Sequence, residues 1–335
     1  MTPATLASSP RRILVVALDN LGDLVFASAL TPPLHDAFPT ATIDIWCKEY
    51  TSPVATLIPH VSDVIAADPF WAVPRHRTRP PVLPFLRSVG AARRKHYDVA
   101  ILSEAPWRTA ASVAAAGIPV RVGLARHRNG PFLTHVLPEE DTHKPVVREQ
   151  ARLLSALGVQ SIDPRYQLDA ARLGPIRDDV RRQLPPRFAA FHPFASVRDR
   201  CVPLTEWMQL AFAMHARSLP VLWVGTPAEL DEVRSSHTHP RGFYVDHVGD
   251  GSLLVSAAAL SLAELFIGHD SGPLHVASAF GAPVVGVFAP GQPDRTFPQG
   301  IGPSRVIHRP TPAGITAATI LHEVDDMMAR PSVVT

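Results

Sequence analysis

The chain has 335 residues, of which 46% are hydrophobic and 19% are charged, a composition typical of globular rather than disordered proteins. This length allows two domains, each with a core of its own. The formal net charge of +2 argues on bulk charge against a nucleic-acid partner.

Neither the cysteines nor the apolar runs indicate export or a membrane span. Cys47 and Cys201 form no CxxC pair, which disfavours a disulfide framework and a structural zinc site. The apolar run at residues 13–18 is too short for a secretion signal, and prolines and glycines interrupt the uncharged stretch at 273–290. We therefore expect a soluble, cytoplasmic protein.

Short apolar strands alternate with helical segments along the first half of the chain. The predicted strands cover residues 13–18, 42–46, 98–102 and 120–124. The predicted helices cover residues 24–37, 107–116 and 146–157. Strands that are apolar at nearly every position are typical of parallel sheets covered by helices on both faces.

The same alternation begins again after Pro186. Its predicted strands cover residues 188–194, 220–225, 264–268 and 283–290, and its predicted helices cover 204–217, 251–260, 272–280 and 313–328. Two such series predict an α/β protein with two doubly wound, Rossmann-like domains. We place the first domain at residues 1–178 and the second at 179–312, with a C-terminal segment, 313–335, whose helix can cross back to the first domain.

Ligands bind beyond the carboxyl ends of the strands in such folds, and the loop after the first strand carries Gly22 and Asp23 there. Gly22 lets a ligand approach the backbone. Asp23 opens a helix, where it can cap free amide groups, and the helix dipole is expected to lower its pKa. The loop lacks the GxGxxG fingerprint of a nicotinamide oxidoreductase, so this class is a weak alternative.

The loop after residues 188–194 carries Ser196, Arg198 and Arg200. Guanidinium groups match phosphate oxygens in pairs, so the two arginines indicate a diphosphate ligand. The alternative interpretation is a basic loop that only faces solvent.

Polar residues also follow the strand at 264–268. Asp270 is followed by Ser271 and Gly272, which begin a helix whose first amide groups form a potential anion site. His275 lies on the same helix face as Ser271. In the alternative interpretation Asp270 and Ser271 only cap the helix and His275 belongs to the core. No D-x-D triplet is present, so we expect an anion site without a metal.

Taken together, three stretches resemble glycosyltransferase family 9, which comprises the heptosyltransferases of lipopolysaccharide core assembly and their relatives. They are ILVVALDNLGDLVFASAL, FHPFASVRDRCVPLTEW and GHDSGPLHVASAFGAPVVGVFAPGQPDRTFP, and with the chain between them the resemblance runs from Arg12 to Arg309. It implies a GT-B architecture, in which two Rossmann-like domains face a central cleft. It also implies inverting transfer with no metal or other cofactor, and ADP-heptose as the donor.

The resemblance assigns roles to individual residues. Asp23 matches the general base that acts on the acceptor hydroxyl. Arg200 stands where the family usually has a lysine, which changes the geometry of the phosphate contact, and Glu229 matches a contact to the ribose. The expected donor site comprises Gly22, Ser196, Arg198, Arg200, Glu229, Asp270, Ser271, Gly272 and His275.

The segment at residues 69–96 is rich in proline and arginine, and the resemblance places it on the acceptor side, with Arg75, Arg77 and Arg79 as acceptor residues. The acceptor can be a glycan, a lipid or a small molecule. The basic segment can meet a phosphorylated lipid or a membrane surface, at the inner face of the cytoplasmic membrane. It can equally be an insertion that only faces solvent.

Two further functions remain open at this point. A sugar-nucleotide epimerase shares the GT-B architecture and needs no acceptor. A non-catalytic protein that binds nucleotide sugars would carry the same donor site without turnover.

Overall fold

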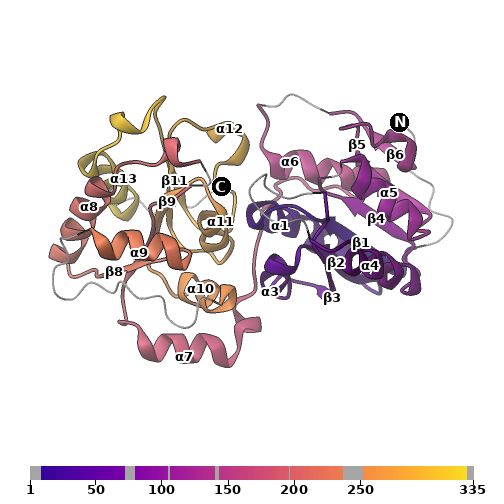
Figure 1. Ribbon diagram of the computed structural model, residues 1–335, viewed down its shortest axis with the longest axis horizontal. Coiled ribbons are helices and arrows are strands. Elements are labelled where there is room, and N and C mark those ends of the chain that lie inside the picture. The colour runs from indigo at the N-terminus through magenta and orange to yellow at the C-terminus, as the bar shows by residue number, and fades with distance from the viewer. Residues whose placement is uncertain are drawn as a thin grey trace. The chain divides into compact units, whose positions relative to one another are not determined.

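The computed structural model describes residues 9–71, 80–104, 106–139, 143–195, 197–236 and 252–329. The chain divides into two compact units, residues 1–166 and 167–335, and each is a parallel sheet flanked by helices (Figure 1). The two doubly wound domains predicted from the strand–helix alternation are therefore present. None of the helices within the described ranges combines the length and the apolar character needed to cross a membrane.

The sheet of the first unit has, among the described residues, the strand order β3-β2-β1-β4-β5-β6, and all its neighbours are parallel. The four predicted strands are confirmed, and two more lie at the edges. The strands are β1 (Arg12–Ala17), β2 (Thr42–Cys47), β3 (Val61–Ala66), β4 (Val99–Leu102), β5 (Val120–Leu124) and β6 (His135–Leu137). Central strand β1 is buried at every position after Arg12, as expected for a strand covered on both faces.

Six α-helices cover this sheet in the described part of the first unit. They are α1 (Leu21–Ala27), α2 (Thr31–Ala37), α3 (Ser52–Ala55), α4 (Val82–Arg94), α5 (Trp107–Ala115) and α6 (Val146–Ala151). The single helix predicted at 24–37 is two helices joined by a 3₁₀ turn at Ser28–Leu30. Pro32 and Pro33 explain the break, because neither can donate the backbone hydrogen bond that a continuous helix requires.

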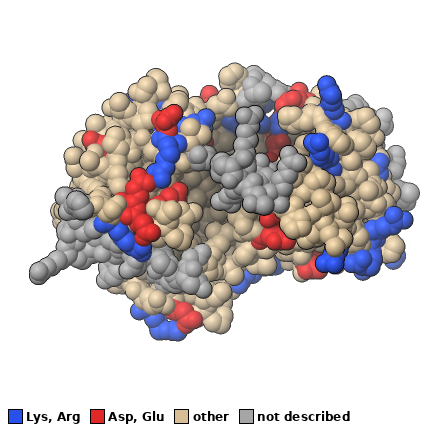
Figure 2. All heavy atoms as spheres, viewed as in Figure 1, with Lys and Arg blue, Asp and Glu red and all other residues tan. Residues whose placement is uncertain are grey.

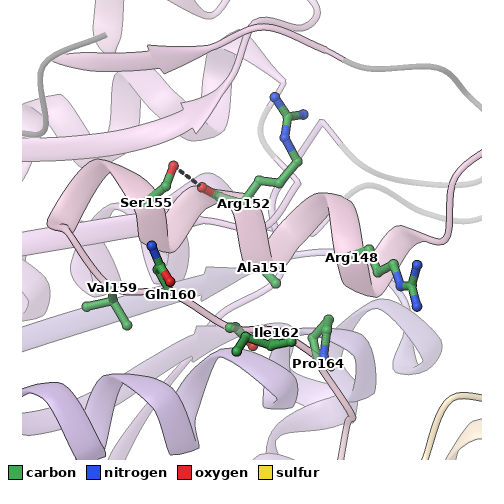
Figure 3. A pocket seen from close by; sticks show the side chains of 9 residues that line it. Arg148, Ala151, Arg152, Ser155, Val159, Gln160, Ile162 and Pro164 are labelled. Carbon is green, nitrogen blue, oxygen red and sulfur yellow. Dashed lines mark hydrogen bonds between the residues drawn. The ribbon is translucent and has the colours of Figure 1, made fainter.

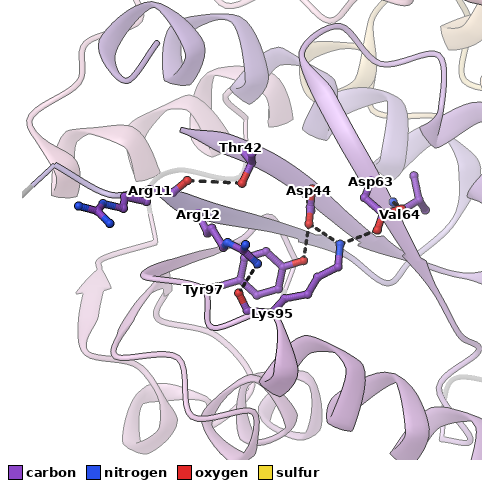
Figure 4. Close-up of polar contacts among 8 residues, drawn as sticks. All are labelled: Arg11, Arg12, Thr42, Asp44, Asp63, Val64, Lys95 and Tyr97. Carbon is purple, nitrogen blue, oxygen red and sulfur yellow. Dashed lines mark hydrogen bonds and ion pairs between the residues drawn. The ribbon is translucent and has the colours of Figure 1, made fainter. Parts of the chain in front are cut away.

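A charged network ties the amino-terminal edge of this sheet to the end of α4 (Figure 4). Lys95 Nζ lies 2.6 Å from Asp44 Oδ2 and 2.6 Å from Asp63 Oδ2. The hydroxyl of Tyr97 donates to the same oxygen of Asp44 at 2.7 Å, and burial together with this carboxylate raises the pKa of Tyr97. The network holds α4 against β2 and β3, at the edge opposite to the loops that carry the predicted site.

The sheet of the second unit has the order β11-β10-β9-β7-β8 among the described residues, again parallel throughout. The strands are β7 (Ala189–His192), β8 (Val221–Trp223), β9 (Leu265–His269), β10 (Val284–Phe288) and β11 (Ser304–His308). The helices are α7 (Pro175–Gln183), α8 (Leu204–Ala216), α9 (Pro227–Ser235), α10 (Leu253–Leu260), α11 (Gly272–Ala279), α12 (Pro293–Thr296) and α13 (Ala317–Ala329). All four predicted strands of this half are present, and β11 adds an edge strand.

The predicted domain limits need two corrections. The division lies at residue 166 and not 178, because Leu168 donates its amide hydrogen to the carbonyl of Ala279 at 3.0 Å and α7 packs on α10. The last helix, α13, packs on α8 of its own unit, where Glu206 accepts the amide hydrogen of Ala317 at 2.8 Å. The described part of the segment predicted as separate, 313–335, therefore belongs to the second unit.

Candidate active site

The loop after β1 places Asp23 in the first turn of α1. The helix begins at Leu21, so Asp23 is its third residue rather than its first. Its Oδ2 accepts the amide hydrogen of Asn20 at 3.1 Å. The hydroxyl oxygen of Tyr50, which follows β2, accepts the amide hydrogen of Leu21 at 2.9 Å. These contacts satisfy free amides at the start of the helix and fix the carboxylate at the carboxyl edge of the sheet.

The pKa of Asp23 is raised to about 7, mainly by burial and next by the neighbouring carboxylate of Asp19. Lys48, whose Nζ lies 3.9 Å from Asp19 Oδ1, acts in the opposite direction, as does the hydrogen bond from Asn20. The predicted lowering of this pKa by the helix dipole is therefore wrong, because the loss of hydration outweighs the favourable contacts. A carboxylate with a pKa near 7 is suited to accept a proton at neutral pH.

A second acidic group near Asp23 was not predicted from the sequence. Glu104 follows β4, and its negative charge contributes to the raised pKa of Asp23. Arg126, which follows β5, lies 2.7 Å from Glu104 and 2.6 Å from Glu149 of α6, with Glu139 at 2.9 Å from its Nε. Glu104 and Arg126 each stand two residues beyond a predicted strand, so the rule that identified Asp23 could also have found them.

In the second unit, β9 and α11 place Asp270, Ser271 and His275 at the carboxyl end of the sheet. Ser271 is the residue that precedes α11, and its hydroxyl donates to the carbonyl of His269 at 2.9 Å. His275 is 2% exposed, and its Nε2 lies 3.4 Å from Asp270 Oδ1. Thr296 of α12 donates its hydroxyl hydrogen to Asp270 Oδ2 at 3.0 Å. The carboxylate of Asp270 is thus oriented from two sides, and Thr296 is a site residue that the sequence alone did not reveal.

A small pocket joins Arg200 to Asp270. It lies where the loops after β7, β9 and β10 meet, and it is lined by Ala195, Arg200, His269, Asp270, Val287, Phe288, Ala289, Pro290 and Gly291. A guanidinium group and a carboxylate from different loops of one sheet edge therefore face the same space. Such an arrangement can bind a phosphate through the arginine and a sugar hydroxyl through the carboxylate.

The other residues predicted for the donor site lie in different surroundings. Arg198 forms an ion pair with Glu232 at 2.7 Å and lies over the ring of Phe194 at 5.2 Å. Glu229 caps α9, because its Oε2 accepts from both the amide and the hydroxyl of Thr226, at 2.8 and 2.9 Å. Ser196 and the acceptor residues Arg75, Arg77 and Arg79 lie outside the described residues.

Two buried histidines support the loops around the pocket. Nε2 of His269 accepts the amide hydrogen of Val202 at 3.1 Å, so its proton resides on Nδ1, 3.2 Å from the carbonyl of Val287. Burial lowers the pKa of His269 to about 4. His192 contacts the carbonyl of Val224 at 2.8 Å, and burial lowers its pKa too. Both rings act as neutral links between neighbouring strand ends.

A larger pocket, of about 410 Å³, lies on the first unit between α6, the 3₁₀ helix that follows it and residues 159–164 (Figure 3). None of the predicted site residues lines it. Figure 3 shows Ile162 and Pro164 below the helix that carries Arg148 and Arg152. Within the described ranges, no group of three or more potential metal ligands lies close enough together to hold an ion.

The sequence model of glycosyltransferase family 9 (heptosyltransferase) matches residues 86–311. The chain belongs to this family. Lipopolysaccharide heptosyltransferase 3 of Escherichia coli is 23% identical over 290 residues, which are 82% of each chain. Among solved structures, E. coli ADP-heptose lps heptosyltransferase II has a TM-score of 0.77 at 20% identity, over 95% of this chain and 98% of the other. E. coli heptosyltransferase WaaC with ADP also has a TM-score of 0.77, at 19% identity, over 94% and 99%.

These similarities confirm the predicted fold and enzyme class. The structural matches show that the two parallel sheets with their helices form the GT-B fold. Family membership makes the protein a glycosyltransferase and does not favour the epimerase, the non-catalytic binding protein or the nicotinamide oxidoreductase considered from the sequence.

Proposed function

We propose that this glycosyltransferase moves a heptosyl group from ADP-heptose to a hydroxyl of a glycan acceptor, with inversion at the anomeric carbon and without a metal. The observation that carries the proposal is the raised pKa of Asp23 at the carboxyl edge of the first sheet, because it suits a general base at neutral pH. Relatives named as lipopolysaccharide heptosyltransferases and as a heptosyltransferase with ADP support the choice of donor and acceptor.

In the proposed reaction the acceptor oxygen forms a bond to the anomeric carbon while the bond from that carbon to the diphosphate breaks. Asp23 takes the acceptor proton, and the electron pair of the broken bond leaves with ADP. Arg200 and the first amides of α11, at Ser271 and Gly272, stabilise the charge that grows on the diphosphate. Asp270, oriented by His275 and Thr296, binds hydroxyls of the sugar.

The remaining predicted contacts complete the proposal. Arg198 and Ser196 belong to the same loop as Arg200 and contribute to the diphosphate contact. Glu229 binds the ribose with the carboxylate oxygen that does not cap α9, and Gly22 lets the donor approach the backbone beside the base. The acceptor is a glycan presented on a lipid, and the enzyme meets it in the cytoplasm at the inner face of the membrane.

Calorimetric titration with ADP, UDP, GDP and NAD, with no metal added, tests the donor site. We expect a preference for ADP and a roughly tenfold or larger loss of ADP affinity in Arg200→Ala, since removal of a charged phosphate contact costs at least about 1.4 kcal/mol. Arg187→Ala is the matched control, because Arg187 pairs with Glu264 at the opposite edge of the same sheet. A preference for UDP or GDP would overturn the donor, and no nucleotide binding would overturn the site.

A further inference from the structure

The first two turns of α4 expose three large apolar side chains. Val82 is 47% exposed, and Leu83 and Leu86 are each 55% exposed. The opposite side of the helix is buried through Phe85 and Ala92, so α4 is already packed by one face and presents a second apolar surface outward. Exposed apolar residues are normally scattered singly over a protein, and three within five positions need an explanation.

Helix α5 extends this surface along the same edge of the sheet. Its first residue, Trp107, is 41% exposed, and the guanidinium group of Arg108 lies 4.6 Å from the centre of its ring. Helices α4 and α5 contact each other, and they follow the carboxyl ends of β3 and β4. The exposed apolar residues of both first turns therefore lie at the edge that also carries Asp23.

The rest of this exposed face is basic. Arg87, Arg93 and Arg94 of α4 are exposed, and the sequence from residue 69 to residue 97 contains no aspartate or glutamate. Lysine and arginine side chains gather at the lower right of Figure 2, where α4 lies in Figure 1. Lys95 anchors the end of the helix in the network of Figure 4, so a fixed helix presents these charges.

We propose that this docking face, formed by Val82, Leu83, Leu86 and Trp107 with Arg87, Arg93, Arg94 and Arg108, binds the surface of an anionic lipid membrane. Apolar side chains on a short helix face insert between head groups, while basic side chains beside them are attracted to anionic lipids. Tryptophan favours the head-group level, where its apolar ring and its polar N–H are both satisfied. A second copy of the chain fits less well, because paired docking faces would oppose arginine to arginine.

Co-sedimentation of the full chain with lipid vesicles tests the docking face. The vesicles contain phosphatidylcholine alone or phosphatidylcholine mixed with anionic phosphatidylglycerol. We expect binding to the mixed vesicles that added salt weakens, and a roughly tenfold lower partition for the double variant Leu83→Asp/Leu86→Asp. Ile162→Asp is the matched control, because Ile162 is a 93% exposed apolar residue elsewhere on the first unit, and it should bind as the wild type does.

Three outcomes would overturn the proposal. One is failure of the wild type to bind the mixed vesicles, and another is equal binding by the wild type and the double variant. The third is a wild-type dimer in solution that the double variant converts to a monomer, which would assign the face to a second copy. Thermal unfolding of the variants checks that they fold, and Leu83→Ala/Leu86→Ala provides a milder version. The assay uses neither donor nor acceptor, so its result is independent of the proposed reaction.

Discussion

Replacing Asp23 with asparagine should make the protein more stable at neutral pH. The ordinary pKa of an aspartate, 3.8, applies in the unfolded chain, whereas burial raises the pKa of folded Asp23 to about 7. Between these two pH values the unfolded state has lost the proton and the folded state still holds it. The free energy of unfolding therefore falls as the pH rises through this window, and it stays at the lower value above pH 7.

The size of the effect follows from the same two values. A rise from 3.8 to about 7, at about 1.4 kcal/mol for each pH unit, lowers the stability by at most about 4 kcal/mol at pH 8. Asparagine carries no charge and keeps an oxygen that can accept from the amide of Asn20. Urea unfolding of the wild type and Asp23→Asn at several pH values measures the difference. If Asp23→Asn changed the free energy of unfolding equally at pH 5 and at pH 8, the reasoning would be refuted.

The same pKa predicts the pH dependence of transfer. If Asp23 is the base, about a tenth of the enzyme is deprotonated at pH 6 and about nine tenths at pH 8, so kcat/KM rises about tenfold over this range. A base with a pKa of 3.8 would give a flat profile. Release of ADP from the donor is the assay. Asp19→Asn is a second test. Removal of this neighbouring charge should lower the pKa of Asp23, so that kcat/KM rises at a lower pH. A flat wild-type profile would contradict a general base with a pKa near 7, and with it the raised pKa of Asp23 on which the proposed mechanism rests.

Three further variants test the supporting contacts. Thr296→Val should raise the KM for the nucleotide sugar several-fold and leave the Kd of ADP unchanged, because Thr296 orients Asp270 and ADP has no transferred sugar. Arg126→Met removes the cation beside the buried Glu149 and the half-buried Glu104, and urea unfolding should show a loss of about 3–5 kcal/mol. Gly300→Ala should lower the Tm, since its Cβ would lie 2.1 Å from the Ser278 carbonyl oxygen, whereas Gly130→Ala meets nothing within 4 Å and serves as the control.

The sequence predicted the central strands better than the edges, for a physical reason. A central strand such as β1 is buried on both faces, so every position is apolar and the run is visible without context. Only two of the six residues of edge strand β3 are buried, and β6 has three residues, so neither forms such a run. Helix α4 was not predicted, because the prolines before it and in its first turn are typical of a loop. Pro84 lies in the first turn, however, where a missing N–H costs little.

The candidate site also contains residues that the sequence predicted and residues that it did not. Asp23, Asp270 and Ser271 stand beside strand ends in the sequence, and the structure places them there. Thr296 could not be found, because its hydroxyl reaches Asp270 from a position 26 residues further along the chain. The sign of the pKa shift of Asp23 was also beyond the sequence. The effect of a helix dipole can be inferred from the position of Asp23 at the start of a predicted helix. Desolvation depends instead on the loops that fold over the carboxylate.

In the proposed reaction, the charge of the leaving diphosphate is met mainly by Arg200 and the first amides of α11. His269 and His192 stand at the ends of the strands that border the pocket, but backbone groups and burial hold them neutral at pH 7. Neutral imidazoles can position loops without adding charge. An arginine is charged at every relevant pH, and helix amides cannot lose their dipole. If Arg200 and these amides contact the diphosphate as proposed, their charge and dipole do not change over the pH range in which Asp23 titrates.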